Sequence, residues 1–161
     1  MKKNVIFLDI DGVLNTSKNS VRLHGAYKAT NGYIKSRDDF GALFDPIACD
    51  NLIYLADTTK SAIVISSTWR KHGLQRMKDL FKFRGIALNI IDVTPILNKE
   101  RGYEIEEWLL QNDWVEKYII IDDDTDFTPE QRNNHFVHTP GENGLDHTAL
   151  VRGLKLLMER V

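Results

Sequence analysis

Short runs of mainly apolar residues dominate the hydrophobic pattern of this chain. They lie at residues 5–8, 62–65, 87–91 and 118–121, with a shorter pair at residues 136–137. A buried helix needs a longer run, whereas apolar side chains on consecutive positions are typical of strands in a sheet that is covered on both faces. The runs therefore predict the strands of a buried parallel sheet.

Helical patterns separate these runs. Asp45 followed by Pro46 predicts an N-cap and a first turn, and Asp146 or Thr148 is the expected cap of the last helix. Apolar residues at helical spacing mark two further helices, at residues 74–85 and around residues 105–109. Strands that alternate with helices are joined by right-handed crossovers. We therefore expect a three-layer, Rossmann-like α/β fold with helices on both faces of a parallel sheet.

One segment, residues 15–44, departs from this alternation. It is polar, contains glycine and shows no clear period, and it is long for a connection in a compact domain. A chain of 161 residues has the size of one domain. We expect a single domain over residues 1–161, in which residues 15–44 form a flap or small cap that is inserted after the first strand and overhangs its end.

The residues that follow the predicted strands are strongly acidic. Ligands of an open parallel sheet bind beyond the carboxyl ends of the strands. The residues at these positions are Asp9, Asp11, Ser66, Ser67, Thr68, Asp92, Asp122, Asp123, Asp124 and Asp126. Clustered carboxylates repel one another unless a cation joins them. Mg²⁺ suits such a cluster because it takes oxygen ligands and completes its shell with water or phosphate oxygens.

Two aspartates separated by one residue, Asp9 and Asp11, end the first strand in the stretch FLDIDGVLN. A carboxylate beside the metal can attack phosphorus. A second carboxylate can protonate the departing oxygen and then deprotonate the hydrolytic water. Gly12 would let the backbone bend away behind them, so this stretch points to phosphoryl transfer.

Four stretches resemble the motifs of the haloacid dehalogenase superfamily of phosphotransferases. DIDGVLN is similar to the first motif, Asp-x-Asp-Gly-[Val/Thr]-Leu, and AIVISS resembles the second, a strand that ends in Ser or Thr. NKERGYEI resembles the third, a Lys or Arg near a helix start, and YIIIDDDTDF the acidic fourth. The stretches SSTWR, RGYEIEEWL and FVHT followed by NGL are similar to the small bacterial and phage branch that includes the phosphatase-like domains of RNA repair proteins.

The resemblance implies roles for individual residues. Asp9 would be the nucleophile and a metal ligand, and Asp11 would be the general acid/base with its backbone carbonyl on the metal. Ser66 would hydrogen-bond the transferring phosphoryl group, and Lys99 would neutralise the charge on Asp9 and the phosphate. Asp122 would complete the metal shell directly or through water, with Asp123 beside it.

Several alternatives stay open within these motifs. They are Ser66 or Ser67 in the second motif, Lys99 or Arg101 in the third, and Asp122, Asp123 or Asp126 as the closest metal ligand. A strand that runs one residue further would turn Ser67 inward in place of Ser66. Trp69 and Arg70 follow the second motif and could stack on a base and hold a phosphate. Alternatively, Trp69 is a packing residue and Arg70 pairs with an acid.

We therefore predict a Mg²⁺-dependent phosphomonoester hydrolase that forms an aspartyl-phosphate. Its expected partner is a phosphorylated substrate, a nucleotide or a polynucleotide end. Phosphorylated small metabolites such as sugar phosphates are the alternative substrates. A non-enzymatic, receiver-like phospho-acceptor domain is the alternative function.

Composition limits the remaining classes. The formal net charge of -2 provides no global basic field, so a polynucleotide would have to bind locally. The single cysteine, Cys49, excludes an internal disulfide and favours a reducing, cytoplasmic compartment. The apolar run before Asp9 is too short for a signal peptide or a membrane span. We expect no membrane association and see no sign of a stable protein partner.

Overall fold

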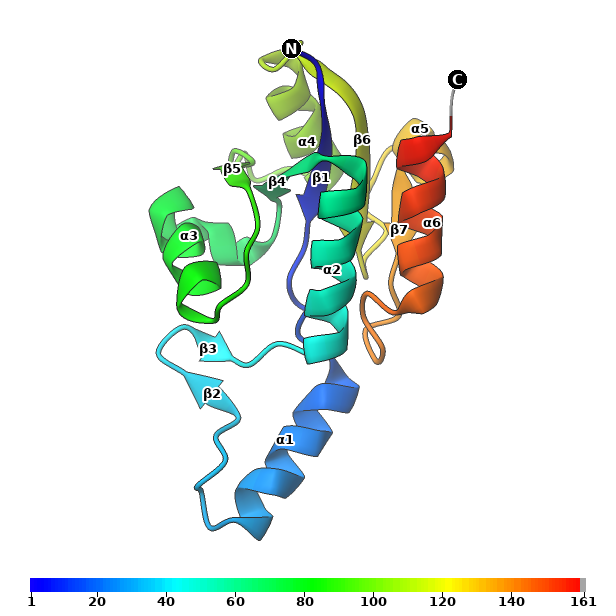
Figure 1. The fold of residues 1–161 in the computed structure, drawn as a ribbon. Helices are drawn as coiled ribbons and strands as arrows, with labels where there is room; N and C mark the ends of the chain where they lie inside the picture. The colour runs from blue at the N-terminus through cyan, green and yellow to red at the C-terminus, as the bar shows by residue number, and fades with distance from the viewer. Residues whose placement is uncertain (160–161) are drawn as a thin grey trace.

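A five-stranded parallel sheet forms the centre of the molecule, in the strand order β5-β4-β1-β6-β7. The computed structural model describes residues 1–159 (Figure 1). The strands are β1 (Lys3–Leu8), β4 (Ser61–Ile65), β5 (Ile90–Val93), β6 (Val115–Asp122) and β7 (Phe136–His138). All four strand pairs are parallel, which confirms the predicted parallel sheet.

Helices cover both faces of this sheet. Alternate side chains of β1 therefore belong to two different cores. Ile6 and Leu8 pack with α2 (Pro46–Thr59), α3 (Leu74–Phe83) and α6 (His147–Met158). Val5 and Phe7 pack on the opposite face with α4 (Arg101–Leu110), whose Trp108 ring meets Phe7 edge to face. Figure 1 shows α2 and α6 side by side on one face, with α4 behind the sheet. The three-layer α/β architecture is therefore confirmed.

The helix caps follow from local chemistry. The Asp45 carboxylate accepts a hydrogen bond from the Ile47 amide at the start of α2. Asp146 accepts from the Ala149 amide at the start of α6, so Asp146 and not Thr148 is the cap. A short helix, α5 (Pro129–Asn134), begins with a reciprocal capping box between Thr128 and Gln131. These side chains satisfy amides that a helix start leaves unpaired.

The third predicted strand begins later than residue 87. Gly85 adopts a φ of 70° after α3, and the following residues lead back to the sheet, where the Asn89 carbonyl makes the first hydrogen bond to β4. Strand β5 is therefore Ile90–Val93. As a consequence Asp92 lies inside this strand, where its carboxylate accepts from the Trp108 indole at 2.7 Å. It belongs to the packing of α4 and not to the strand-end cluster.

The inserted segment is more regular than its sequence indicated. It contains a helix, α1 (Ser17–Ala29), and a small hairpin of β2 (Arg37–Asp38) and β3 (Gly41–Ala42). Only Asn19 and Leu23 of α1 are buried, so the helix has no apolar stripe that a periodicity search can find. Figure 1 shows α1 projecting away from the sheet, while the hairpin lies below α3.

Within residues 1–159, no helix is both long enough and apolar enough to cross a bilayer.

Candidate active site

The ends of three central strands bring the second and fourth motifs to Asp9. Leu8 of β1 pairs with Ile65 of β4 and with Ile121 of β6. The next residue on each strand is therefore Asp9, Ser66 or Asp122, all at one level of the sheet. Because side chains alternate along a strand, these three project to the face that α4 covers.

Three carboxylates meet at this level. Carboxylate oxygens of Asp9, Asp122 and Asp123 all lie within 4.8 Å of one another. Asp9 is 4% exposed and Asp122 is fully buried, whereas Asp123 is exposed. Gly12 leaves room for Asp123: it has a φ of 78°, and a Cβ atom there would lie 2.2 Å from Asp123 Oδ2. A side chain at position 12 would therefore displace one member of the cluster.

Arg101 is the cation that holds the two buried carboxylates together. Its Nη1 lies 3.2 Å from Asp9 Oδ1 and also pairs with Asp122 Oδ2. Burial, and then the neighbouring Asp122 carboxylate, raise the pKa of Asp9 to about 7, although Arg101 opposes the shift. Burial also raises the pKa of Asp122. The single guanidinium of Arg101 therefore does not neutralise all the carboxylates of the cluster.

The cluster fits a divalent metal ion. Its donors are carboxylate oxygens, the ligands that hard divalent cations prefer. When ionised, the three carboxylates exceed the single Arg101 charge by two. Asp126 does not join them, because its Oδ2 accepts from the Arg101 amide at the start of α4. Of the three acids proposed as ligands of the fourth motif, the structure brings Asp122 and Asp123 to Asp9.

The two serines of the second motif have different surroundings. Ser67 Oγ accepts a hydrogen bond from the Trp69 amide at 3.2 Å and caps the 3-10 helix η1 (Thr68–His72). Ser66 Oγ is buried and has no hydrogen-bond partner among residues 1–159. An unpaired buried hydroxyl is costly, and Ser66 lies at the level of Asp9. Ser66 is therefore the serine that is free to hydrogen-bond a ligand.

The two basic residues of the third motif also separate. Lys99 is exposed in the loop before α4 and makes no ion pair within the described chain. Arg101 is on the first turn of α4, which faces the carboxylates. The structure therefore places Arg101, and not Lys99, beside the carboxylates of Asp9 and Asp122.

Asp11 lies at the exposed side of the cluster, and two neighbours orient its carboxylate. Trp69 Nε1 donates to Asp11 Oδ2 at 3.0 Å, and Asn15 Nδ2 donates to Oδ1 at 2.9 Å. The carboxylate of Asp11 is not part of the three-acid group. Asn15 was not among the predicted site residues, although it stands four residues after Asp11 in the same stretch.

Arg70 is a structural residue, contrary to the proposed role in substrate binding. Its guanidinium is buried and donates to the carbonyls of Ser66, Ser67 and Thr94, and it pairs with Glu104 of α4. These bonds use the guanidinium inside the protein. Arg70 thereby joins the loop after β4, which carries Ser66, to α4.

The loops around the cluster are also supported from β7. Thr139 Oγ1 donates to the Gly12 carbonyl at 2.9 Å, and a ring nitrogen of His138 lies 3.0 Å from the Asp123 carbonyl oxygen. The sequence pattern of this segment predicted only a short strand. Its contacts connect the first and fourth motifs behind the acidic group.

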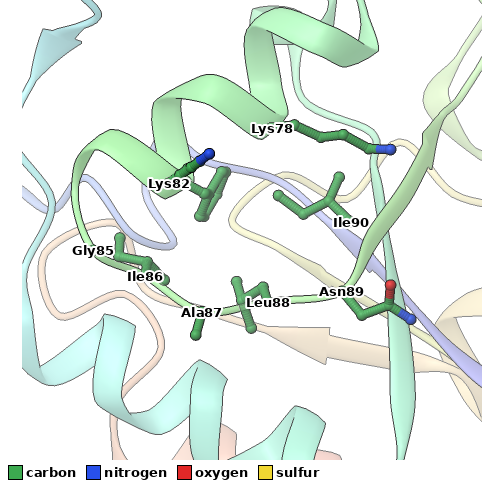
Figure 2. A pocket seen from close by; sticks show the side chains of 9 residues that line it. Lys78, Lys82, Gly85, Ile86, Ala87, Leu88, Asn89 and Ile90 are labelled. Atoms are coloured by element: carbon green, nitrogen blue, oxygen red, sulfur yellow. The ribbon is translucent and has the colours of Figure 1, made fainter.

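One large cavity lies away from this site. It has a volume of about 480 Å³ and lies between α3 and residues 85–90, which lead into β5 and include its first residue (Figure 2). Lys78 and Lys82 of α3 line it, but none of the acidic strand-end residues does. It opens at the amino end of β5, whereas the carboxylates lie at the carboxyl ends of the strands.

Comparison with family models identifies one match. The model of the "HAD domain in Swiss Army Knife RNA repair proteins" matches residues 5–150, where HAD denotes haloacid dehalogenase. This range includes all four motifs and the whole inserted segment. Comparison with curated proteins and with solved structures returned no match.

The buried pair of Arg70 and Glu104 yields a stability prediction. We expect Glu104→Ala to lower the free energy of unfolding by about 3 kcal/mol, because the Arg70 guanidinium would remain buried without its counter-charge. Chemical denaturation measures this value. Glu106→Ala, at an exposed position of the same helix, should change it by less than about 0.5 kcal/mol. Equal stabilities of the two variants would contradict a structural role of the pair.

The raised pKa of Asp9 predicts a pH-dependent stability in the absence of metal. Between the ordinary value of 3.8 and about 7, folded Asp9 retains a proton that the unfolded chain releases, so stability falls as pH rises through this range. In EDTA, the wild type should lose on the order of 2 kcal/mol relative to Asp9→Asn between pH 5 and pH 8. Denaturant titrations at both pH values test this. Parallel changes in the two proteins would contradict it.

Proposed function

Because the chain belongs to the HAD domain family of Swiss Army Knife RNA repair proteins, we propose that it is a Mg²⁺-dependent phosphomonoester hydrolase. The observation that carries the proposal is the buried Asp9 carboxylate, which shares one end of the sheet with Ser66, Arg101, Asp122 and Asp123. This arrangement offers a nucleophile, a hydrogen-bond donor, a fixed positive charge and a set of metal ligands. Substrates would be nucleotides or polynucleotide ends.

Asp9, Asp122 and Asp123 would hold the Mg²⁺ ion. Bound there, the ion supplies positive charge that keeps Asp9 ionised and neutralises the phosphate oxygens. This charge matters because burial and Asp122 raise the pKa of Asp9, and only the ionised carboxylate is nucleophilic. Arg101 contributes a second, permanent positive charge beside the same oxygen.

The reaction then has two steps. In the first, an oxygen of Asp9 attacks phosphorus, the bond from phosphorus to the leaving oxygen breaks, and protonated Asp11 gives its proton to that oxygen. In the second, Asp11 takes a proton from water, the water oxygen attacks phosphorus, and the bond to Asp9 breaks with release of inorganic phosphate. Ser66 Oγ donates a hydrogen bond to the phosphoryl group in both steps.

Trp69 and Asn15 are positioning residues for Asp11. Their hydrogen bonds occupy one lone pair on each carboxylate oxygen, and each oxygen has a second lone pair available. The carboxylate is therefore held in one direction while it can still exchange a proton with the leaving group. Such positioning lowers the entropy cost of proton transfer.

The nucleophile assignment predicts the behaviour of Asp9→Asn. With p-nitrophenyl phosphate and Mg²⁺, this variant should lose at least about a thousandfold in kcat, because an amide does not attack phosphorus. Asp124→Asn, an exposed residue in the loop after β6, is the matched control and should keep activity. Undiminished turnover by Asp9→Asn would refute the mechanism. Stoichiometric, stable labelling of the wild type without turnover would instead support a phospho-acceptor.

The third motif yields a separate prediction. Arg101→Gln should lower kcat/KM for the same substrate by about a hundredfold, because the phosphoryl group and two buried carboxylates lose their permanent counter-charge. Lys99→Gln should change it less than twofold. Steady-state kinetics at saturating Mg²⁺ measures both variants, and circular dichroism verifies that each is folded. A larger loss for Lys99→Gln than for Arg101→Gln would contradict the assignment.

A further inference from the structure

A second cavity adjoins Asp11 and is distinct from the one in Figure 2. We call it the hairpin cavity. It has a volume of about 540 Å³ and lies between the β2–β3 hairpin, η1 and the beginning of α3. Asp11 and Trp69 belong to its lining. Its volume falls within the range of about 300–1,000 Å³ that is typical of small-molecule sites.

The wall formed by the hairpin is held in place. Arg84, the residue directly after α3, donates two hydrogen bonds to the Asp38 carboxylate, at 2.9 and 2.8 Å. Arg76 lies over the Phe40 ring, 4.2 Å from its centroid, and donates to the Asp39 carbonyl at 3.1 Å. The hairpin is therefore anchored to α3 by several contacts, and the cavity exists before any ligand binds.

The hairpin cavity concentrates positive charge on a chain whose net charge is -2. Arg37, Lys71 and Arg76 line it together with His72, against the single additional acid Asp39. None of the three permanent cations is paired with a carboxylate within residues 1–159. An anionic group is the ligand that such a lining favours.

Trp69 connects this cavity to the proposed chemistry. Its indole lines the cavity and donates to Asp11, the residue that would protonate the leaving oxygen. A group in the cavity would consequently belong to the leaving part of the substrate, beyond the phosphoryl group that Asp9 attacks. Because the lining is cationic, that leaving part should itself carry negative charge.

We propose that the hairpin cavity binds a phosphodiester next to the terminal phosphate of a polynucleotide. The inference rests on the proposed phosphatase function and narrows its substrates. Sugar phosphates and nucleoside monophosphates have no second phosphate to place there. Arg37 and Lys71 are the specificity residues, since each is exposed, whereas Arg76 is also needed to hold the hairpin.

Binding tests the cavity independently of hydrolysis. The probe is a fluorescein-labelled trinucleotide with terminal hydroxyl groups, which offers phosphodiesters but no phosphomonoester. The double variant Arg37→Gln/Lys71→Gln should weaken its Kd about tenfold, measured by fluorescence anisotropy in Mg²⁺. The slope of log Kd against log salt should fall by about 0.7, the contribution of one phosphate that a protein neutralises on a single strand. A merely structural role would not change this slope.

The matched control is Lys78→Gln/Lys82→Gln, in the cavity of Figure 2. Like the first double variant, it removes two positive charges. Both lie on α3, and neither residue lines the hairpin cavity. It should leave both the Kd and the salt slope at the wild-type values. Equal effects of the two double variants would overturn the proposal, because they would show a nonspecific effect of net charge.

Kinetics tests the link to catalysis. The ratio of kcat/KM for a terminally phosphorylated trinucleotide to that for p-nitrophenyl phosphate should fall about tenfold in the Arg37→Gln/Lys71→Gln variant. A methylphosphonate next to the terminal phosphate should lower the wild-type ratio similarly. An unchanged ratio in both experiments would overturn the proposal. If the trinucleotide binds as expected but no phosphate ester is hydrolysed, the proposed function fails while the binding site stands.

Discussion

Mutual repulsion of carboxylates at the end of the central strands is the constraint on which this structure depends. The parallel register of β1 with β4 and β6 places Asp9 and Asp122 side by side in a buried position. Neither the sheet nor its apolar cores could compensate for two such charges. Arg101 does so from the start of α4, and a divalent cation at the same oxygens would complete the compensation. The site therefore requires positive charge beside its carboxylates.

This requirement explains why several contacts connect α4 to the loops that follow the strands. Asp126 accepts from the first amide of α4, and Glu104 of α4 pairs with Arg70 after β4. These contacts fix the orientation of the helix from both sides, so the Arg101 guanidinium reaches the carboxylates. Arg70 in turn holds the carbonyls of Ser66 and Ser67. The buried pair of Arg70 and Glu104 thus fixes the second motif relative to the third.

The insertion after β1 gives the site an open but asymmetric entrance. Helix α1 extends away from the sheet (Figure 1), whereas the hairpin is anchored by the pair of Asp38 with Arg84, the residue after α3. The hairpin side carries a cationic cavity beside Asp11. A substrate with charge beyond its terminal phosphate would therefore be held on one side of the reacting group, where Trp69 also hydrogen-bonds the Asp11 carboxylate.

Much of the fold follows from patterns that need no partner to be recognised. Short apolar runs predicted the strands, although the third began at Ile90, since sequence spacing does not show where the chain rejoins the sheet. The caps Asp45 and Asp146 followed from local hydrogen bonding. Helix α1 was missed because a helix with so few buried residues leaves no periodic signal. Asp92 was predicted to follow the third strand. It lies inside β5, because this strand begins and ends later than the apolar run indicated.

The sequence by itself determined the chemistry available: two aspartates after one strand, a hydroxyl after the second, a basic residue before a helix and acids after another strand. Only the tertiary structure decided among neighbours. It brought Arg101 and not Lys99 to the carboxylates, left the hydroxyl of Ser66 free while Ser67 caps η1, and buried Arg70 against Glu104. The physical reason is that strand register and helix placement set which side chain faces the site. Residues one or two positions apart in the chain can face opposite sides, and their chemistry alone does not distinguish them.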